Sequence, residues 1–197
     1  MPTIVIPFRA EGAKQRLAEE LRAELARAML ADVVAAAEEV GRTLVADGRA
    51  QGAAVEAALS DVREMPVLVV NADLPAVTPR DLLALLGSIP PEGIAVAAAA
   101  DGTTNALGLA AHGLFEPLYG PGSAERFLAL ALSSPSLFRP VYGPGSASRF
   151  GALAPSRVLD LPNLAEDVDT LADLERLEPR LGPRTLAALE SLRSAAR

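Results

Sequence analysis

Apolar residues along this chain fall into short runs that suit strands and four-residue spacings that suit helices. The run "TIVIPF" at 3–8 is short and rich in β-branched residues, which predicts a buried strand. After it, apolar residues recur at every fourth position with charged residues between them. They are Leu17, Leu21, Leu25, Met29 and Val33. This spacing predicts a long amphipathic helix.

The same alternation continues to the end of the chain and predicts an α/β fold. Further strands are expected at 42–47, 66–73, 93–100, 105–111 and 156–161. Further helices are expected at 53–62, 78–86, 123–132, 169–177 and 182–197. Thr78 and Thr170 suit the N-caps of two of these helices, and Pro79 and Asp81 follow Thr78 at N1 and N3. We therefore expect a mostly parallel central sheet flanked by helices, in a single domain over 1–197.

Composition removes several kinds of chemistry. The 197 residues contain no cysteine, so thiolate catalysis, disulfides and Cys-ligated zinc are excluded. The single histidine, His112, excludes a multi-histidine metal site. Any metal bound here would be a hard cation held by carboxylates.

The charge and the length of the apolar runs limit the partners. A net charge of −7 disfavours nucleic acid and anionic membrane surfaces. No apolar run is long enough for a signal peptide or a membrane span, so we expect a cytoplasmic protein. The Ala-rich helices leave room for a homodimer, although no segment marks an interface.

In open parallel sheets, ligands bind where the carboxyl ends of strands turn into loops. The loop after the first strand carries Arg9, Gly12, Lys14 and Arg16 and runs into a helix. A basic, glycine-containing loop before a helix suits the binding of phosphate. An ordinary loop with solvated charges would give the same pattern.

Acidic residues follow two other strands. Asp73 lies in "NADLP", where the strongest apolar run stops, and Asp167 and Asp169 lie in "EDVDT". In an extended segment Asp167 and Asp169 would point the same way, and a cation between them would relieve their repulsion. Three such oxygen donors would hold Mg²⁺ together with substrate phosphates. A turn aspartate and a polar lead-in to a helix are the alternative interpretations.

Hydroxyl-bearing residues and glycines suggest a second anion site. Thr103 and Thr104 lie in "DGTTNAL", and "YGPGS" at 119–123 leads into a predicted helix. Backbone N–H groups at that helix start and the Ser123 hydroxyl would bind an anion. Alternatively, Ser123 serves only as an N-cap after a Gly-Pro turn. Together these loops indicate an enzyme that joins a phosphorylated small molecule to a nucleotide.

Five motifs in this order resemble the 2-phospho-L-lactate guanylyltransferases, which include the phosphoenolpyruvate guanylyltransferases of coenzyme F-420 biosynthesis. They are "GAKQRL", "NADLP", "TNAL", "YGPGS" and "EDVDTLADL". The resemblance covers nearly the whole chain. It implies a Rossmann-like nucleotidyltransferase domain that transfers GMP from GTP to phosphoenolpyruvate or 2-phospho-L-lactate and releases pyrophosphate. A same-fold enzyme for a sugar phosphate or molybdopterin and a non-catalytic nucleotide-binding relative remain as alternatives.

The resemblance also implies roles for individual residues. The Mg²⁺ ligands would be Asp73, Asp167 and Asp169. The three-carbon acceptor would be held by Thr104, Gly120 and Ser123. The catalytic residues would be Lys14, Arg16 and Asp73. The nucleotide would be bound by Arg9, Lys14, Asp47, Gly48, Gln51 and Gly52.

The chain departs from the family pattern in two places. Between the first helix and "DGRAQG" at 47–52 it has one strand, where the family usually has a further strand-helix unit. In addition, the segments 114–127 and 137–150 agree at 11 of 14 positions, which indicates a local duplication. Only one copy can fill a single acceptor site. We favour the first because "SAERFLALAL" continues as a helix; otherwise Gly143 and Ser146 take the roles of Gly120 and Ser123.

Overall fold

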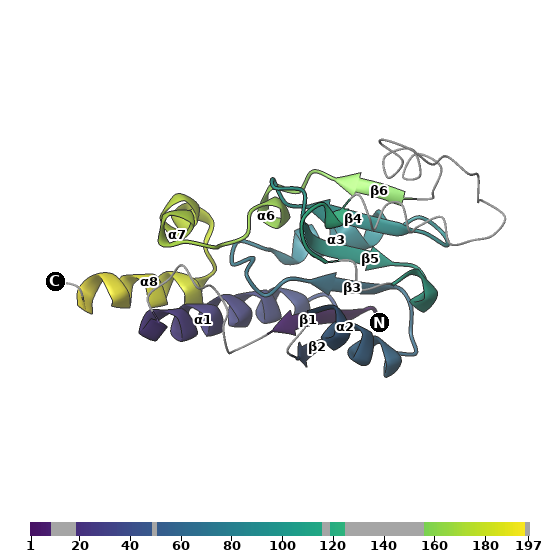
Figure 1. Ribbon diagram of the computed structural model, residues 1–197, viewed down its shortest axis with the longest axis horizontal. Coiled ribbons are helices and arrows are strands. Elements are labelled where there is room, and N and C mark those ends of the chain that lie inside the picture. Colours follow the sequence, from purple (N-terminus) through teal and green to yellow (C-terminus); the bar gives the residue numbers. More distant parts are fainter. Residues whose placement is uncertain (9–18, 49–50, 116–118, 125–155, 196–197) are drawn as a thin grey trace.

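The computed structural model of this chain describes residues 1–8, 19–48, 51–115, 119–124 and 156–195. They form a six-stranded sheet with helices on both faces (Figure 1). The strands are β1 (Thr3–Phe8), β2 (Arg42–Asp47), β3 (Val67–Val70), β4 (Ile94–Ala98), β5 (Thr104–Leu109) and β6 (Ser156–Leu159). The helices are α1 (Glu19–Glu38), α2 (Gln51–Ser60), α3 (Pro79–Gly87), α6 (Pro162–Ala165), α7 (Leu171–Leu177) and α8 (Pro183–Ala195). Short 3₁₀ turns span His112–Leu114 and Glu178–Arg180.

The strands follow the order β2-β1-β3-β5-β4-β6. β5 runs antiparallel to both of its neighbours, whereas β1 pairs in parallel with β2 and β3, and β4 with β6. The expected mostly parallel sheet is therefore confirmed. Because β5 is reversed, its first residue, Thr104, lies at the same edge as the carboxyl ends of β3 and β4.

Alternating residues of the central strands bury two faces of the sheet. On one face, Val5 of β1 packs in a cluster with Val55 of α2. On the other, Ile4 and Ile6 pack in a cluster that includes Val33 of α1 and residues of α3 and α6. The apolar runs in the sequence thus supply both layers of a helix–sheet–helix sandwich, as expected for a largely parallel sheet.

A third apolar cluster lies beyond the sheet. It joins the first half of α1, through Leu25 and Met29, to α7, α8 and Val168. Figure 1 shows α8 beside α1, and the two helices are in contact. The apolar face of α1 therefore packs against two parts of the fold. Residues near its start pack on the C-terminal helices, and later residues pack on the sheet.

Both predicted caps are present. Thr78 accepts from the backbone N–H of Asp81 while the Asp81 side chain accepts from the Thr78 backbone, and Thr170 forms the same capping box with Asp173. Four predicted strands end earlier than expected: those over 66–73, 93–100, 105–111 and 156–161 end at Val70, Ala98, Leu109 and Leu159. The Asn71 backbone N–H still donates to the Asn105 carbonyl, and the chain then turns at residues 72 and 73. The four-residue helix α6 was not predicted.

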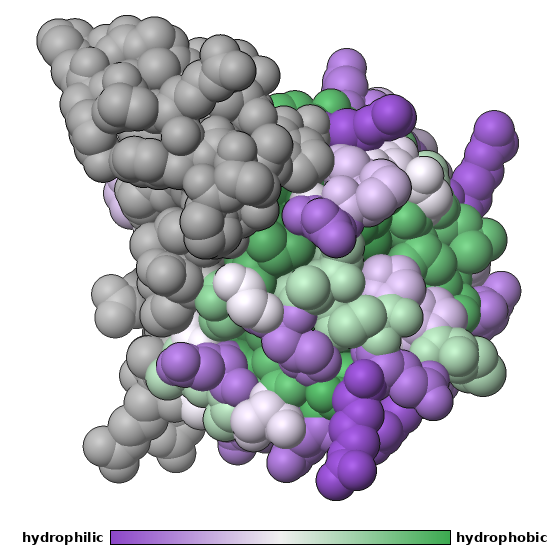
Figure 2. Space-filling view, turned by 90° about the vertical axis from the view of Figure 1, so that its right-hand side faces the viewer, coloured by the Kyte–Doolittle hydropathy of each residue, from purple (hydrophilic) through white to green (hydrophobic). Residues whose placement is uncertain are grey.

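Most of the helix predicted at 123–132 lies outside the described residues. In the described part of the chain, no helix combines the length and the apolar character needed to cross a membrane. On the face drawn in Figure 2, apolar residues are interspersed with charged and polar ones.

Candidate functional site

The predicted site residues that the structure describes lie mainly at one edge of the sheet. Asp47 ends β2 and pairs with Phe8, the last residue of β1. Thr104 begins β5 and pairs with Ala98, the last residue of β4. The loops that follow or precede these residues therefore meet along a common edge, where ligands bind in open α/β sheets.

A bulge in β5 determines where the Thr104 side chain lies. The pairing of β4 with β5 shifts between Ala97 and Ala98, so that Ala97 pairs with Ala106 but Ala98 pairs with Thr104. Asn105 is the extra residue. Such a bulge changes the direction in which the neighbouring side chain points. Thr104 is buried, and its hydroxyl oxygen accepts a hydrogen bond of 3.0 Å from the hydroxyl of Ser123, which is fully buried.

The segment before Ser123 is a tight turn that requires glycine. Gly120 and Gly122 have φ angles of 107° and 69°, which side chains disfavour. The Ser123 N–H closes the turn on the Gly120 carbonyl at 2.9 Å, and the Ala124 N–H bonds to the Gly102 carbonyl at 3.3 Å. The first copy of "YGPGS" therefore packs beside the β4–β5 connection, and its serine is hydrogen-bonded to Thr104. Gly143 and Ser146 of the second copy lie outside the described residues.

Asn71 connects this pair to the start of α2. Its side-chain N–H donates to the Thr104 carbonyl at 3.1 Å, and its side-chain oxygen accepts from Gln51 at 2.6 Å. Its backbone N–H also donates to the Asn105 carbonyl at 2.9 Å. A continuous polar chain thus runs from Gln51 through Asn71 and Thr104 to Ser123. Asn71 was not predicted as a site residue, although it is the first residue of "NADLP".

The structure brings Asp73 next to the segment that carries Asp167 and Asp169. The backbone N–H of Val168 donates to the Asp73 carbonyl at 3.1 Å, and the Val168 side chain is fully buried. Aspartates from segments far apart in the sequence therefore flank one main-chain bond. Carboxylate oxygens are the ligands that Mg²⁺ prefers in proteins. Among the described residues, however, no three acidic or histidine side chains are grouped closely enough to hold a metal ion.

The remaining predicted nucleotide residues lie at the turn from β2 into α2. Gly48 follows Asp47, and Gln51 and Gly52 begin α2. A Cβ atom at Gly48 would lie 2.8 Å from the Cβ of Ala54, so only glycine lets α2 pack this closely on the end of β2. Arg9, Lys14 and Arg16 lie outside the described residues.

Two ionisable groups near the site have shifted pKa values. The hydroxyl and the backbone N–H of Thr103 donate to the Asp101 carboxylate and lower its pKa. Burial raises the pKa of Tyr119, which therefore remains a neutral phenol at physiological pH. The Asp101 bonds shape the connection from β4 to β5 and so lead the chain into Thr104.

Solved structures of other proteins share this fold. A protein described as a nucleotide-diphospho-sugar transferase from Desulfovibrio desulfuricans is similar with a TM-score of 0.64 and 17% identity, over 98% of this chain and 95% of that one. The bifunctional IspDF of Campylobacter jejuni is similar with a TM-score of 0.53 and 11% identity, over 89% of this chain and 53% of that one. At this identity the likeness concerns the fold alone. The fold is the Rossmann-like α/β fold of nucleotidyltransferases.

Sequence comparison identifies the family. No family model matches the chain. A phosphoenolpyruvate guanylyltransferase of Nocardia farcinica is 32% identical over 93% of this chain and 88% of its own length. A 2-phospho-L-lactate guanylyltransferase of Natrialba magadii is 34% identical over 53% of this chain and 60% of its own length. The chain therefore belongs to the family of 2-phospho-L-lactate and phosphoenolpyruvate guanylyltransferases.

The single strand predicted between the first helix and "DGRAQG" is present. Between α1 and Gly48 the structure has one strand, β2, and this strand ends the sheet. The alignment with the Nocardia farcinica protein extends over 221 residues, more than the 197 of this chain, so that relative has residues that this chain lacks.

Proposed function

We propose that this chain transfers GMP from GTP to phosphoenolpyruvate or 2-phospho-L-lactate and releases pyrophosphate, as a step in coenzyme F-420 biosynthesis. The proposal rests on the family to which the chain belongs. The observation in the structure that supports it best is the buried Thr104–Ser123 pair at the edge of the sheet. Two buried hydroxyls beside a glycine turn are suited to bind the phosphate of a small acceptor.

The reaction needs positioning more than proton transfer. A phosphate oxygen of the acceptor attacks the α-phosphorus of GTP, the bond from that phosphorus to the bridging oxygen breaks, and pyrophosphate leaves with the electron pair. The nucleophile is already an anion, so no general base is required. Catalysis then depends on alignment of the two substrates and on neutralisation of their charge.

The acceptor would bind through Thr104, Gly120 and Ser123, held in place by Asn71. The GTP phosphates would meet the positive side chains of Arg9, Lys14 and Arg16. These residues follow β1 in the sequence, and β1 ends beside β2 at the same edge. The guanine would lie near the turn from β2 into α2, with Asp47, Gly48, Gln51 and Gly52.

Asp73, Asp167 and Asp169 would hold Mg²⁺, which would neutralise charge on the phosphates when bound. The main-chain bond from Val168 to Asp73 supports this assignment because it brings the two segments together. The assignment requires these carboxylates to turn toward a common point, since the described side chains do not form a group of three.

Pyrophosphate release from GTP with Mg²⁺ tests the function. We would compare phosphoenolpyruvate, 2-phospho-L-lactate and no acceptor, with ATP and CTP as nucleotide controls. The proposal expects release that needs GTP and one of the two acids, and it expects Asp73→Asn to abolish that release. Release with a sugar phosphate in place of these acids would support another acceptor. A folded protein that releases no pyrophosphate with any pair would refute the proposal and favour a non-catalytic relative.

A further inference from the structure

Asn105, the extra residue of the β5 bulge, has a buried side-chain nitrogen that forms no hydrogen bond within the part of the chain that the structure describes. The residue is only 2% exposed. A buried donor without a partner costs free energy, because it has lost its bonds to water and gained none in the protein. Such groups are rare in folded proteins, and each calls for an explanation.

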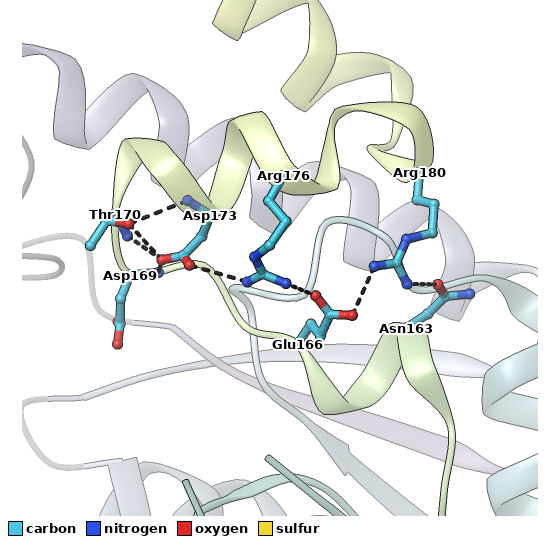
Figure 3. A network of polar contacts seen from close by, with 7 residues as sticks. All are labelled: Asn163, Glu166, Asp169, Thr170, Asp173, Arg176 and Arg180. Carbon is cyan, nitrogen blue, oxygen red and sulfur yellow. Dashed lines mark hydrogen bonds and ion pairs between the residues drawn. The ribbon is translucent and has the colours of Figure 1, made fainter. Parts of the chain in front are cut away.

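The other two asparagines of the chain use both ends of their side-chain amides. Asn71 is bonded through its nitrogen and its oxygen, as described above. Asn163 donates to Asp81 at 3.0 Å and accepts from Arg180 at 3.2 Å, and Figure 3 shows the second of these bonds. The amides that join segments of the fold are therefore satisfied, and the nitrogen of Asn105 differs from them.

The strand register places the Asn105 amide on the same face of the sheet as the Thr104 hydroxyl. Ala98 pairs with Thr104 and packs in the apolar cluster that includes α2, so Thr104 faces α2 as well. Ala106 packs in the cluster on the opposite face. Successive residues of a strand point to opposite faces, so Asn105, next to Ala106, also faces α2. The bulge therefore turns two consecutive side chains toward one side of the sheet.

Ser123 lies on this face too. Its hydroxyl donates to that of Thr104 at 3.0 Å, and the next residue, Ala124, packs in the same apolar cluster as Ala98. The two hydroxyls and the Asn105 amide thus share one face at the edge of the sheet where ligands bind. The hydroxyls bond to each other, whereas the amide nitrogen has no such partner among the described residues.

The proposed acceptors carry a second anionic group beside the phosphate. In phosphoenolpyruvate and in 2-phospho-L-lactate, the phosphate ester oxygen and the carboxylate are bonded to the same carbon atom. The Cα atoms of consecutive residues are about 3.8 Å apart, so Thr104 and Asn105 suit two groups this close together. A hydrogen bond from an amide N–H to a carboxylate is stronger than one to a neutral oxygen. A simple sugar phosphate has no carboxylate at this position.

We propose that Asn105 determines the specificity for the acceptor by donating from its side-chain amide to the carboxylate of the three-carbon acid, whose phosphate binds at Thr104 and Ser123. The inference rests on the proposed function for the identity of the acceptor. The hydrogen bond of the amide is completed only by a substrate that bears a carboxylate. A substrate with a phosphate alone leaves the buried amide unsatisfied, and such a site discriminates strongly against it.

The test compares phosphoenolpyruvate and 2-phospho-L-lactate with ethyl phosphate, which is 2-phospho-L-lactate with its carboxylate replaced by hydrogen. Isothermal titration calorimetry on the full chain, without nucleotide, gives a Kd for each ligand. The measured quantity is the ratio of the Kd of ethyl phosphate to the Kd of the better acid. Both values come from the same variant, so a smaller folded fraction does not change the ratio.

Asn105→Leu replaces the amide with an apolar side chain of similar size, and Asn105→Ala is the smaller alternative if leucine prevents folding. We expect the ratio to fall by about tenfold or more in both variants, since a hydrogen bond to a charged group is lost. The Kd of ethyl phosphate should change by less than about twofold, because both hydroxyls are retained. Asn163→Ala is the matched control: it removes an amide from α6, which packs on the other face of the sheet, and should leave the ratio unchanged.

Stability separates this role from a structural one. If Asn105 serves the fold, Asn105→Leu should lower the midpoint of urea denaturation of the ligand-free chain. If its nitrogen is held for a ligand, the substitution removes a buried unsatisfied donor, so the midpoint should stay the same or rise. A lower midpoint together with an unchanged ratio would assign Asn105 to the fold and overturn the inference.

The ratio also separates the inference from the proposed function, because binding is measured without turnover. An unchanged ratio in both variants overturns the role of Asn105, and so does an equal loss of affinity for ethyl phosphate and the acids. Wild-type protein that does not prefer the acids, or binds none of the three ligands, overturns it as well. A chain that prefers the acids through Asn105 but releases no pyrophosphate refutes only the reaction. Acid-dependent release of pyrophosphate with a ratio that does not depend on Asn105 refutes only its role.

Discussion

Thr104 reaches its position because β5 contains one extra residue. Without the bulge at Asn105, the pairing of β4 with β5 would continue in register and the Thr104 side chain would point to the opposite face. The hydroxyl instead meets Ser123 in a buried environment. At the scale of single residues, the candidate acceptor site therefore depends on this pair of hydroxyls. Removal of either hydroxyl takes away the hydrogen-bond partner of the other.

Ser123→Ala should weaken binding of the acceptor more than binding of the nucleotide. It leaves the buried Thr104 hydroxyl without this donor and removes a hydroxyl from the candidate phosphate site, at a cost of about 1.5 kcal/mol, or roughly tenfold in KM for the acceptor. The KM for GTP should remain within twofold or so of wild type, a difference of about 0.4 kcal/mol. Initial rates of pyrophosphate release, with each substrate varied in turn, provide both constants.

Ser88→Ala is the matched control for this variant. The Ser88 hydroxyl donates to the Ala84 carbonyl at the exposed end of α3, so its loss should change neither constant. Equal increases in both KM values in Ser123→Ala would contradict a role at the acceptor site. No change in Ser123→Ala, together with a raised acceptor KM in Ser146→Ala, would transfer that role to the second copy of the turn.

Sequence reasoning grouped Thr104 with Ser123, whose hydroxyls are in contact in the structure, but it missed Asn71. The first two follow from motif order and from the chemistry of hydroxyls near glycine. Asn71 was not found because its role depends on which strands are neighbours: its amide meets Thr104 only because β5 lies next to β3. A single sequence carries no direct signal of strand order.

At the scale of elements, the start of α8 is capped from another helix. Asp32 of α1 is buried, and its carboxylate accepts from the backbone N–H groups of Arg184 and Thr185 at 3.1 and 2.8 Å. It also accepts from the Thr185 hydroxyl at 2.7 Å. Gly182 lies so close that an added Cβ would come within 2.4 Å of the Asp32 Cγ. This glycine and this aspartate therefore fix how α8 docks on α1.

Asp32→Ala should destabilise the fold by about 2–3 kcal/mol, since it leaves buried donors at a helix start unsatisfied. Urea denaturation followed by circular dichroism measures the change in free energy of unfolding. Asp61→Ala serves as the control because Asp61 is exposed, and it should change the stability by less than about 0.5 kcal/mol. A loss in Asp32→Ala no greater than that of the control would show that α8 is held by its apolar contacts alone.

The connection from β4 to β5 should show a measurable pH effect. Thr103→Val removes the hydroxyl that most lowers the pKa of Asp101, so the pKa of Asp101 should rise toward its ordinary value of 3.8. Because the folded-state pKa lies below the unfolded-state value, this interaction stabilises the protein above the unfolded-state pKa and is lost as the pH falls through the folded-state pKa. Carbon-13 NMR titration of the Asp101 carboxyl measures the shift.

The stability difference between wild type and Thr103→Val should therefore be present at neutral pH and shrink on acidification below about pH 4. A difference that stays constant down to strongly acidic pH would mean that the variant acts through packing. An unchanged Asp101 pKa in the variant would mean that the backbone N–H of Thr103 is sufficient to hold the carboxylate.

Local sequence patterns predicted where helices and strands occur better than they predicted the direction of a strand in the sheet. The capping boxes at Thr78 and Thr170 follow from side chains within four residues of each other, so the sequence reveals them directly. The reversed direction of β5 does not follow from its apolar run, because buried residues repeat in the same way in either direction.

At the scale of the whole molecule, the candidate metal ligands lie in two parts of the fold that pack separately. Asp73 belongs to a loop of the sheet, whereas Asp167 and Asp169 precede α7, which packs with α8 and the start of α1 in a separate apolar cluster. The direct main-chain ties between these parts include Val168 to Asp73 at 3.1 Å and Gly182 to Pro75 at 2.7 Å. A cation bound by all three aspartates would add a further link between the sheet and the C-terminal helices.

Mg²⁺ should therefore stabilise the folded chain and slow the local opening of these segments. Binding to the folded state alone adds about 2.7 kcal/mol at a concentration 100 times the Kd, so the melting temperature should rise with Mg²⁺ and fall back on chelation. Amide hydrogen exchange should slow most at residues 73–75 and 166–170, because the cation would hold both segments at once. Asp73→Asn should remove both effects. Slower exchange in only one segment would show that the cation binds one group of aspartates and does not link the sheet to the C-terminal helices.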